Sequence, residues 1–107
     1  MRRAARRDAN EPEIIAALTA LGAHVEQLSQ DGVPDLLISY RRRLYLMEVI
    51  GPAKAKRYRA TGGLTPAQVK WHRRFVSNPL ASPLIFIAYN VQEAAQMIIC
   101  TAPPEKP

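Results

Sequence analysis

The chain has 107 residues, of which 48% are hydrophobic and 22% are charged. This length fits one domain with a modest core, and the composition excludes a chain that is disordered throughout. The net charge of +6 favours a polyanionic partner, nucleic acid ahead of anionic lipid, although small domains are also often basic by chance.

Cysteine usage and hydropathy exclude further classes. The single cysteine, Cys100, rules out an internal disulfide and any zinc site built on cysteines. No apolar run approaches the ~20 residues of a membrane span, and no apolar segment follows the N-terminal arginines as it would in a signal peptide. We therefore expect a cytoplasmic, soluble protein that does not contact a membrane.

The N-terminal third predicts a basic arm and a helix. Residues 1–9 lack apolar periodicity and are expected to be a flexible arm ahead of a domain at 10–100. Asn10 is suited to cap the helix, Pro12 fits its first turn, and Glu13 completes a capping box. Gly22 ends the helix. One apolar stripe runs along it, made by Ile14, Ile15, Leu18 and Leu21.

A hairpin is predicted next. Residues 23–28 fit a short strand and 30–32 a turn. Residues 35–40 and 44–50 are apolar runs that predict an antiparallel hairpin around a polar turn at 41–43. The segment 51–63 combines glycines and a proline with basic residues, which predicts a basic loop.

The C-terminal half adds a helix, a strand and a helix. Thr65 caps a helix that reaches about Val76, 84–89 is a buried strand, and 91–99 is a short helix. Residues 101–107, rich in proline, are expected to be a disordered tail. The order α-β-β-β-α-β-α predicts an α/β (α+β) domain, with a central mixed sheet flanked by helices.

Two acidic residues stand inside strand-like apolar runs. Asp35 begins the first hairpin strand and Glu48 lies near the end of the second, so both fall at one end of the sheet. In a strand Glu48 and Ile50 share one face, while Met47 and Val49 share the other. A carboxylate in such a run costs several kcal/mol unless it is paired or binds a metal. An Asx-turn explains Asp35 alone, but the pair favours a shared site for a divalent ion.

Glu11 is a third candidate. On a helical wheel it lies near the centre of the apolar stripe, whereas Glu13 points away. An acid on the sheet-facing side of a helix end can reach a metal at the sheet edge. The alternative is a charge stabilised at a helix N-terminus.

These pieces together resemble the PD-(D/E)XK nuclease superfamily, in particular its VRR-NUC-type and Holliday-junction-resolvase-like members. The likeness runs from Glu11 to about Gln96. Its motifs are Glu11-Pro12-Glu13-Ile14 closed by Gly22, Gly32-Val33-Pro34-Asp35, Glu48-Val49-Ile50, and Leu64-Thr65-Pro66-Ala67-Gln68-Val69-Lys70-Trp71.

The resemblance implies a restriction-endonuclease-like core and phosphodiester hydrolysis that depends on Mg²⁺ or Mn²⁺. It makes Asp35, Glu48 and the Val49 carbonyl metal ligands, with Glu11 as the acidic helix residue. Gln68 matches a glutamine on the helix after the hairpin. The alternative for Gln68 is an exposed polar residue in a first helical turn.

Ile50 departs from the family pattern, which has a lysine at this position to activate the attacking water and balance charge in the transition state. Three interpretations follow: a variant inactivated by substitution, a pseudonuclease that only binds DNA, or a site in which Lys54 or Lys56 takes the lysine's role. We favour a nuclease scaffold with lowered or absent activity in this chain.

Basic residues suggest how DNA would bind. The group that follows Glu48 borders the site and predicts a phosphate-contacting flap, with Tyr58 available to stack. Arg3, Arg6 and Arg7 of the arm would follow a second stretch of backbone. Arg41–Arg43 fit a solvated turn. His72 fits a surface histidine, the alternative being a contact with a phosphate. The flap consists of Lys54, Lys56, Arg57, Tyr58 and Arg59.

The leading hypothesis is a metal-dependent, structure-selective DNA endonuclease acting on branched DNA such as a Holliday junction. A homodimer is expected, because a junction resolvase cuts two strands symmetrically. One alternative is a non-catalytic DNA-binding subunit, which Ile50 favours. The other is a basic protein-interaction adaptor, in which Asp35 and Glu48 would pair with arginines.

Overall fold

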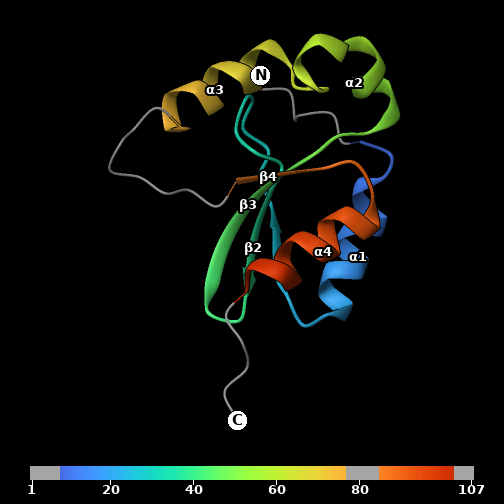
Figure 1. Cartoon of the computed structure of the whole chain (residues 1–107), viewed down its shortest axis with the longest axis vertical. Coiled ribbons are helices and arrows are strands. Elements are labelled where there is room, and N and C mark those ends of the chain that lie inside the picture. The colour runs from blue at the N-terminus through green and yellow to red at the C-terminus, as the bar shows by residue number, and fades with distance from the viewer. Residues whose placement is uncertain (1–7, 77–84, 103–107) are drawn as a thin grey trace.

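The computed structural model describes residues 8–76 and 85–102, which form one four-stranded sheet flanked by helices. The predicted α+β class and the order of its main elements are confirmed, with two short helices added after the third strand (Figure 1). The elements are α1 (Glu11–Ala20), β1 (His24–Gln27), β2 (Leu36–Tyr40), β3 (Arg43–Val49), α2 (Pro52–Arg57), the 3-10 helix η1 (Arg59–Thr61), α3 (Pro66–Val76), β4 (Ile85–Ala88) and α4 (Val91–Thr101).

The sheet has the strand order β1-β2-β3-β4, with antiparallel pairs up to β3 and a parallel pair between β3 and β4. The β2–β3 hairpin closes through Arg41 and Arg42, whose φ angles of 47° and 69° are those of a type I′ turn. The predicted turn at 41–43 is one residue too long, because Arg43 pairs with Tyr40. Residues 1–7 of the arm predicted at 1–9, and residues 103–107 of the tail predicted at 101–107, lie outside the described residues.

The hydrophobic core lies between the sheet and the pair α1 and α4, which lie side by side on one face of it (Figure 1). Met47 and Val49 point into this core, and Glu48 between them points to the opposite face, as the strand alternation predicts. Burying each large apolar side chain contributes about 1.5–3 kcal/mol. The fully buried members include Ile14, Leu18, Leu36, Ile38, Met47, Val49, Ala94 and Ile98.

Both ends of α1 are defined by specific residues. Gly22, with φ of 99°, ends the helix as predicted: its N–H donates to the Thr19 carbonyl, and the Ala23 N–H donates to the Leu18 carbonyl. The predicted capping box at the start is wrong. The Asn10 side chain makes no capping bond; its Nδ2 instead donates to the carbonyls of Ile50 at 3.3 Å and Tyr89 at 3.2 Å, at the ends of β3 and β4.

The segment 51–63 is helical, so the prediction of a basic loop is wrong. Gly51 is extended and Pro52 occupies the first turn of α2, where a missing N–H costs no hydrogen bond. Alanine, lysine and arginine, all good helix formers, fill the rest of α2. Gly62 and Gly63 end the segment with φ of 67° and 101°. The glycines and the proline therefore delimit short helices rather than loosening a loop.

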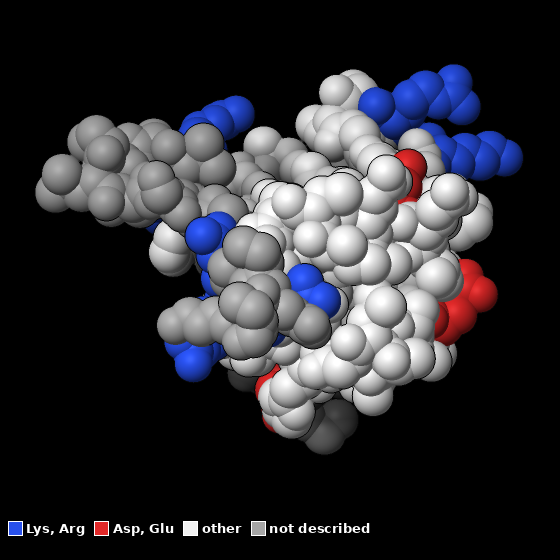
Figure 2. All heavy atoms as spheres, turned by 60° about the horizontal axis from the view of Figure 1, so that its bottom comes forward, with Lys and Arg blue, Asp and Glu red and all other residues white. Residues whose placement is uncertain are grey.

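The end of the sheet opposite the β3–α2 connection is the β2–β3 turn, where Arg41, Arg42 and Arg43 are exposed. Figure 2, turned by 60° from Figure 1 so that its bottom comes forward, shows a described surface with an uncharged centre, Lys and Arg side chains around it and Asp and Glu side chains at its right edge. Across residues 8–76 and 85–102, no helix combines the length and apolar character needed to cross a bilayer.

Candidate metal and phosphate site

Asp35 sits immediately before β2, at the end of the sheet where β3 finishes. Its Oδ2 accepts a 2.8 Å hydrogen bond from the Val49 N–H, and the residue is buried. The strand register, in which Leu36 faces Met47, brings Asp35 next to Glu48 as the hairpin prediction requires. Burial raises the pKa of the Asp35 carboxyl, against the lowering effect of the Val49 hydrogen bond.

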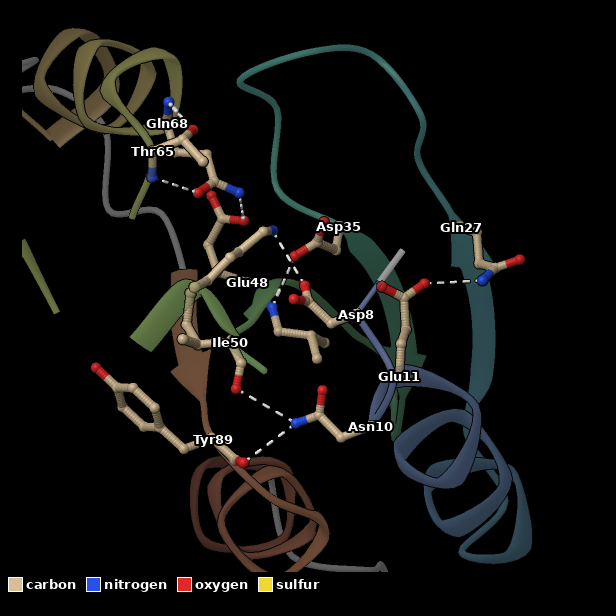
Figure 3. A network of polar contacts seen from close by, with 12 residues as sticks. Asp8, Asn10, Glu11, Gln27, Asp35, Glu48, Ile50, Thr65, Gln68 and Tyr89 are labelled. Carbon is tan, nitrogen blue, oxygen red and sulfur yellow. Dashed lines mark hydrogen bonds and ion pairs between the residues drawn. The ribbon is translucent and has the colours of Figure 1, made fainter. Parts of the chain in front are cut away.

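Glu48 is fully buried, and its carboxyl contacts two side chains of α3. Its Oε1 accepts a 3.0 Å hydrogen bond from Gln68 Nε2, and its Oε2 lies 2.8 Å from His72 Nε2 (Figure 3 draws the Gln68 contact). Burial, followed by the charge of Asp35, raises the pKa of Glu48 to about 8. Two acids thus share one low-dielectric site, in which Asp35 disfavours the ionisation of Glu48, while a hydrogen bond with Glu48 lowers the pKa of Asp35.

Gln68 is aimed at Glu48 by the start of α3. The Thr65 hydroxyl accepts from the Gln68 N–H at 3.2 Å, and Gln68 Oε1 accepts from the Thr65 N–H at 2.9 Å, which is a reciprocal capping box. With Oε1 occupied in this way, the amide nitrogen faces Glu48 (Figure 3). Gln68 is buried, so the alternative of an exposed polar residue is wrong, whereas Thr65 as a cap is confirmed.

Glu11 lies at the start of α1 and is fully buried. Its Oε2 accepts a 2.8 Å hydrogen bond from Gln27 Nε2 of β1. One carboxylate oxygen each from Asp8, Glu11 and Asp35 lies within 4.8 Å of the other two, and Figure 3 shows the three side chains converging. Carboxylate oxygens at this spacing are the donors that Mg²⁺ and Mn²⁺ prefer.

Lys54, from the first turn of α2, brings a cation to these acids. Its Nζ lies 3.0 Å from Asp8 Oδ2, and both side chains are largely shielded from solvent. Burial alone would lower the pKa of Lys54, but the charges of Asp35, Asp8 and Glu48 raise it above its ordinary value. Lys54 also lines a small cavity of about 170 Å³ together with Asp35, Gln68 and the loop that precedes Asp35.

Ile50 contributes no polar atom from its side chain. It is 1% exposed; its backbone N–H donates to the Ala88 carbonyl at 2.9 Å, and its carbonyl accepts from Asn10. The side chain packs against Gly63, so closely that a Cβ at position 63 would overlap Ile50 Cγ2. The side chain at position 50 therefore packs at the end of η1 and offers no polar group to the carboxylates.

Sequence reasoning missed two members of this site. Asp8 was assigned to the flexible arm, and its signal is an acid among arginines three residues before Glu11. His72 was predicted to be a surface histidine, which is wrong because it contacts Glu48 and burial lowers its pKa. Its signal was the spacing: His72 follows Gln68 by four residues, so both lie on the same face of α3.

The predicted DNA-contacting residues divide into those that the structure describes, on α2 and η1, and those that lie outside it. Lys56, Arg57 and Arg59 are exposed on α2 and η1, next to Lys54. Tyr58 is half-buried between these helices, with the Arg57 guanidinium carbon 5.4 Å from the centre of its ring. Arg3, Arg6 and Arg7 lie outside the described residues. One end of the sheet thus combines buried acids with exposed basic residues.

Comparison of this chain with protein-family models, with curated proteins and with solved structures gave no match.

Proposed function

We propose that the chain is a metal-dependent endonuclease that hydrolyses phosphodiester bonds in DNA, with Lys54 supplying the positive charge that Ile50 lacks. The observation that carries the proposal is the contact of Lys54 with Asp8 beside Asp35 and Glu48. A half-buried cation next to clustered carboxylates offers one group for a phosphate and several for a divalent ion. The resemblance to PD-(D/E)XK nucleases supports the same assignment.

The donor set fits a divalent cation. Asp8, Glu11 and Asp35 offer hard oxygen ligands within 4.8 Å of one another, and burial makes a neutralising ion favourable there. Bound Mg²⁺ or Mn²⁺ would polarise the phosphate and lower the pKa of a coordinated water. Glu48 and the Val49 carbonyl, the other predicted ligands, stay predictions, because both Glu48 oxygens are already engaged by Gln68 and His72.

The chain's own residues supply the remaining functions. Lys54 stabilises the negative charge that develops on the phosphate, as fixed donors do in hydrolytic sites. Gln68 and His72 hold the Glu48 carboxyl on the side of α3. Lys56, Arg57 and Arg59 are exposed on the same segment as Lys54, and would contact phosphates on either side of the cleaved bond.

The test is a cleavage assay on end-labelled four-way junction, flap and linear duplex DNA, in Mg²⁺, Mn²⁺ or EDTA. Asp35→Asn is expected to abolish cleavage. Lys54→Ala should lower the rate on the order of 100-fold, the usual cost of one transition-state donor. Lys56→Ala is the matched control: it is the same residue type on the same helix but exposed, and it should change the rate only a few-fold.

Equal losses for Lys54→Ala and Lys56→Ala would contradict the role given to Lys54. Ile50→Lys belongs in the same series. If this variant alone cuts DNA, the scaffold is a nuclease and Lys54 does not replace the missing lysine.

A second candidate function is a non-catalytic DNA-binding subunit, and the buried apolar side chain of Ile50 favours it. It predicts that the chain and Ile50→Lys cut no DNA, yet bind it equally with Mg²⁺ and with EDTA. A preference for branched DNA and a homodimer are further proposals. The junction arm of the cleavage assay and light scattering with and without junction DNA test them.

A further inference from the structure

A second cavity, larger than the one at the acids, opens beside Lys54. It has a volume of about 530 Å³ and lies between the segment before α1 and the α2 region. Clefts that hold small organic groups measure roughly 300–1,000 Å³, so this cavity can accept one. The residues that matter for its chemistry are Asp8, Pro52, Ala53, Lys54, Arg57 and Tyr58.

The lining of this cavity is suited to a flat aromatic group. Pro52, Ala53 and the ring of Tyr58 supply apolar surface, while the Lys54–Asp8 ion pair supplies a polar end. Arg57 stands over the Tyr58 ring at 5.4 Å. Aromatic rings and guanidinium planes are the surfaces on which proteins stack unpaired nucleobases.

The two cavities meet at shared residues. Lys54 and Thr65 line both the 530 Å³ cavity and the 170 Å³ cavity that contains Asp35 and Gln68. A strand whose phosphate lies at Lys54 would therefore bring the base of an adjoining nucleotide to the larger cavity. A base that is paired and stacked inside a duplex has no free face to enter it.

We propose that this cavity binds one unpaired nucleobase next to the phosphate that is cleaved, so that the enzyme acts on DNA with an unpaired nucleotide at that position. The inference rests on the proposed nuclease function and specifies its substrate class. The cavity reads the presence of a base rather than its identity, because stacking on Tyr58 and Arg57 tolerates any base.

The test compares two labelled overhang DNAs that differ only at the first unpaired nucleotide, which is either intact or abasic. Both carry the same phosphates, so fluorescence anisotropy in EDTA isolates the contribution of the base without cleavage. We expect the intact DNA to bind on the order of tenfold more tightly, in line with stacking measured on other proteins. A duplex that pairs the same nucleotide should bind like the abasic DNA.

Variants locate the effect. Tyr58→Ala should remove the preference for the intact DNA and Tyr58→Phe should keep it. Phe75→Ala, which alters an exposed aromatic residue on α3, is the matched control and should also keep it. Equal affinity of the unaltered chain for intact and abasic DNA, or no binding of either, overturns the inference. If the chain cleaves DNA but does not prefer the intact base, the base-binding inference fails and the nuclease proposal stands. If it prefers the intact base but cleaves no DNA, the nuclease proposal fails and base binding stands.

Discussion

At the scale of single residues, Ile50 and Gly63 are fitted to each other. The Ile50 side chain occupies the space where any Cβ on Gly63 would stand, and Gly63 also has a φ of 101°. The pair joins the end of β3 to the end of η1, and so helps to fix the segment that carries Lys54. An apolar residue at 50 therefore has a packing role here, independent of catalysis.

Gly63→Ala is expected to destabilise the protein more than Gly22→Ala. Gly22 has nearly the same φ, 99°, but a Cβ there would meet nothing within 4 Å. The Gly22→Ala variant therefore measures the cost of backbone strain alone, about 1 kcal/mol. At Gly63 the overlap with Ile50 should add about 1–3 kcal/mol to the loss in the free energy of unfolding. Urea denaturation of both variants gives the comparison, and equal losses would show that Ile50 does not restrict position 63.

At the scale of elements, the start of α3 links helix stability to the site. Thr65 and Gln68 satisfy each other's backbone N–H groups, and the same Gln68 side chain donates to Glu48. α4 is capped by a similar device without any link to the acids, since Asn90 Oδ1 accepts from the Glu93 N–H at 2.8 Å. Substitutions at the caps of these two helices therefore distinguish the loss of a helix cap from the loss of a contact that orients a site residue.

Thr65→Ala and Asn90→Ala should each lower the free energy of unfolding by about 1 kcal/mol, the usual cost of a cap. Under the proposed function, only Thr65→Ala should also slow DNA cleavage, because Gln68 loses the partner that orients it. Thermal unfolding and the cleavage assay are measured on both variants. Equal cleavage by the two would mean that the capping box serves the helix alone.

The elements show which parts of this protein follow from local sequence. Apolar alternation, Gly22 and Thr65 define strands and helix ends by short-range rules, so β1–β3, α1 and α3 were predictable. α2 was not, because glycine and proline favour a loop by local rules, whereas here they border a helix. The clustering of Asp8 with Glu11, and of His72 with Glu48, depends on tertiary contacts that no local pattern encodes.

At the scale of the whole molecule, a positive net charge coexists with a buried cluster of acids. The net charge is +6, yet Glu11, Asp35 and Glu48 are buried together at one end of the sheet. Lys54 offsets part of this charge. Without a bound metal, the negative charge that Lys54 does not offset opposes folding whenever the acids are ionised.

The stability of the metal-free protein should therefore fall as the pH rises. The pKa of Glu48 is about 8 in the fold against an ordinary value of 4.5, so between these values the folded protein keeps a proton that the unfolded chain has lost. The raised pKa of Asp35 acts in the same direction, and the lowered pKa of His72 acts oppositely. Urea denaturation in EDTA at about pH 5 and about pH 8 measures the change.

Glu48→Gln, which keeps an acceptor for Gln68, is the control for this pH dependence. It should reduce the loss of stability between the two pH values, because the titrating group is gone while the packing is nearly unchanged. An identical loss in the variant would mean that Glu48 does not titrate in this range.

Asn10 has a consequence for how the molecule opens. Its single amide nitrogen joins the start of α1 to the carbonyls of Ile50 and Tyr89, which directly follow β3 and β4 and lie 40 and 79 positions away in sequence. Asp8 and Glu11 lie close to Asn10 in sequence. The end of β3 leads into α2, which carries Lys54. Fluctuations that detach the segment before α1 must therefore break contacts to both strands, so the acids and the lysine are expected to become exposed as one cooperative unit rather than separately.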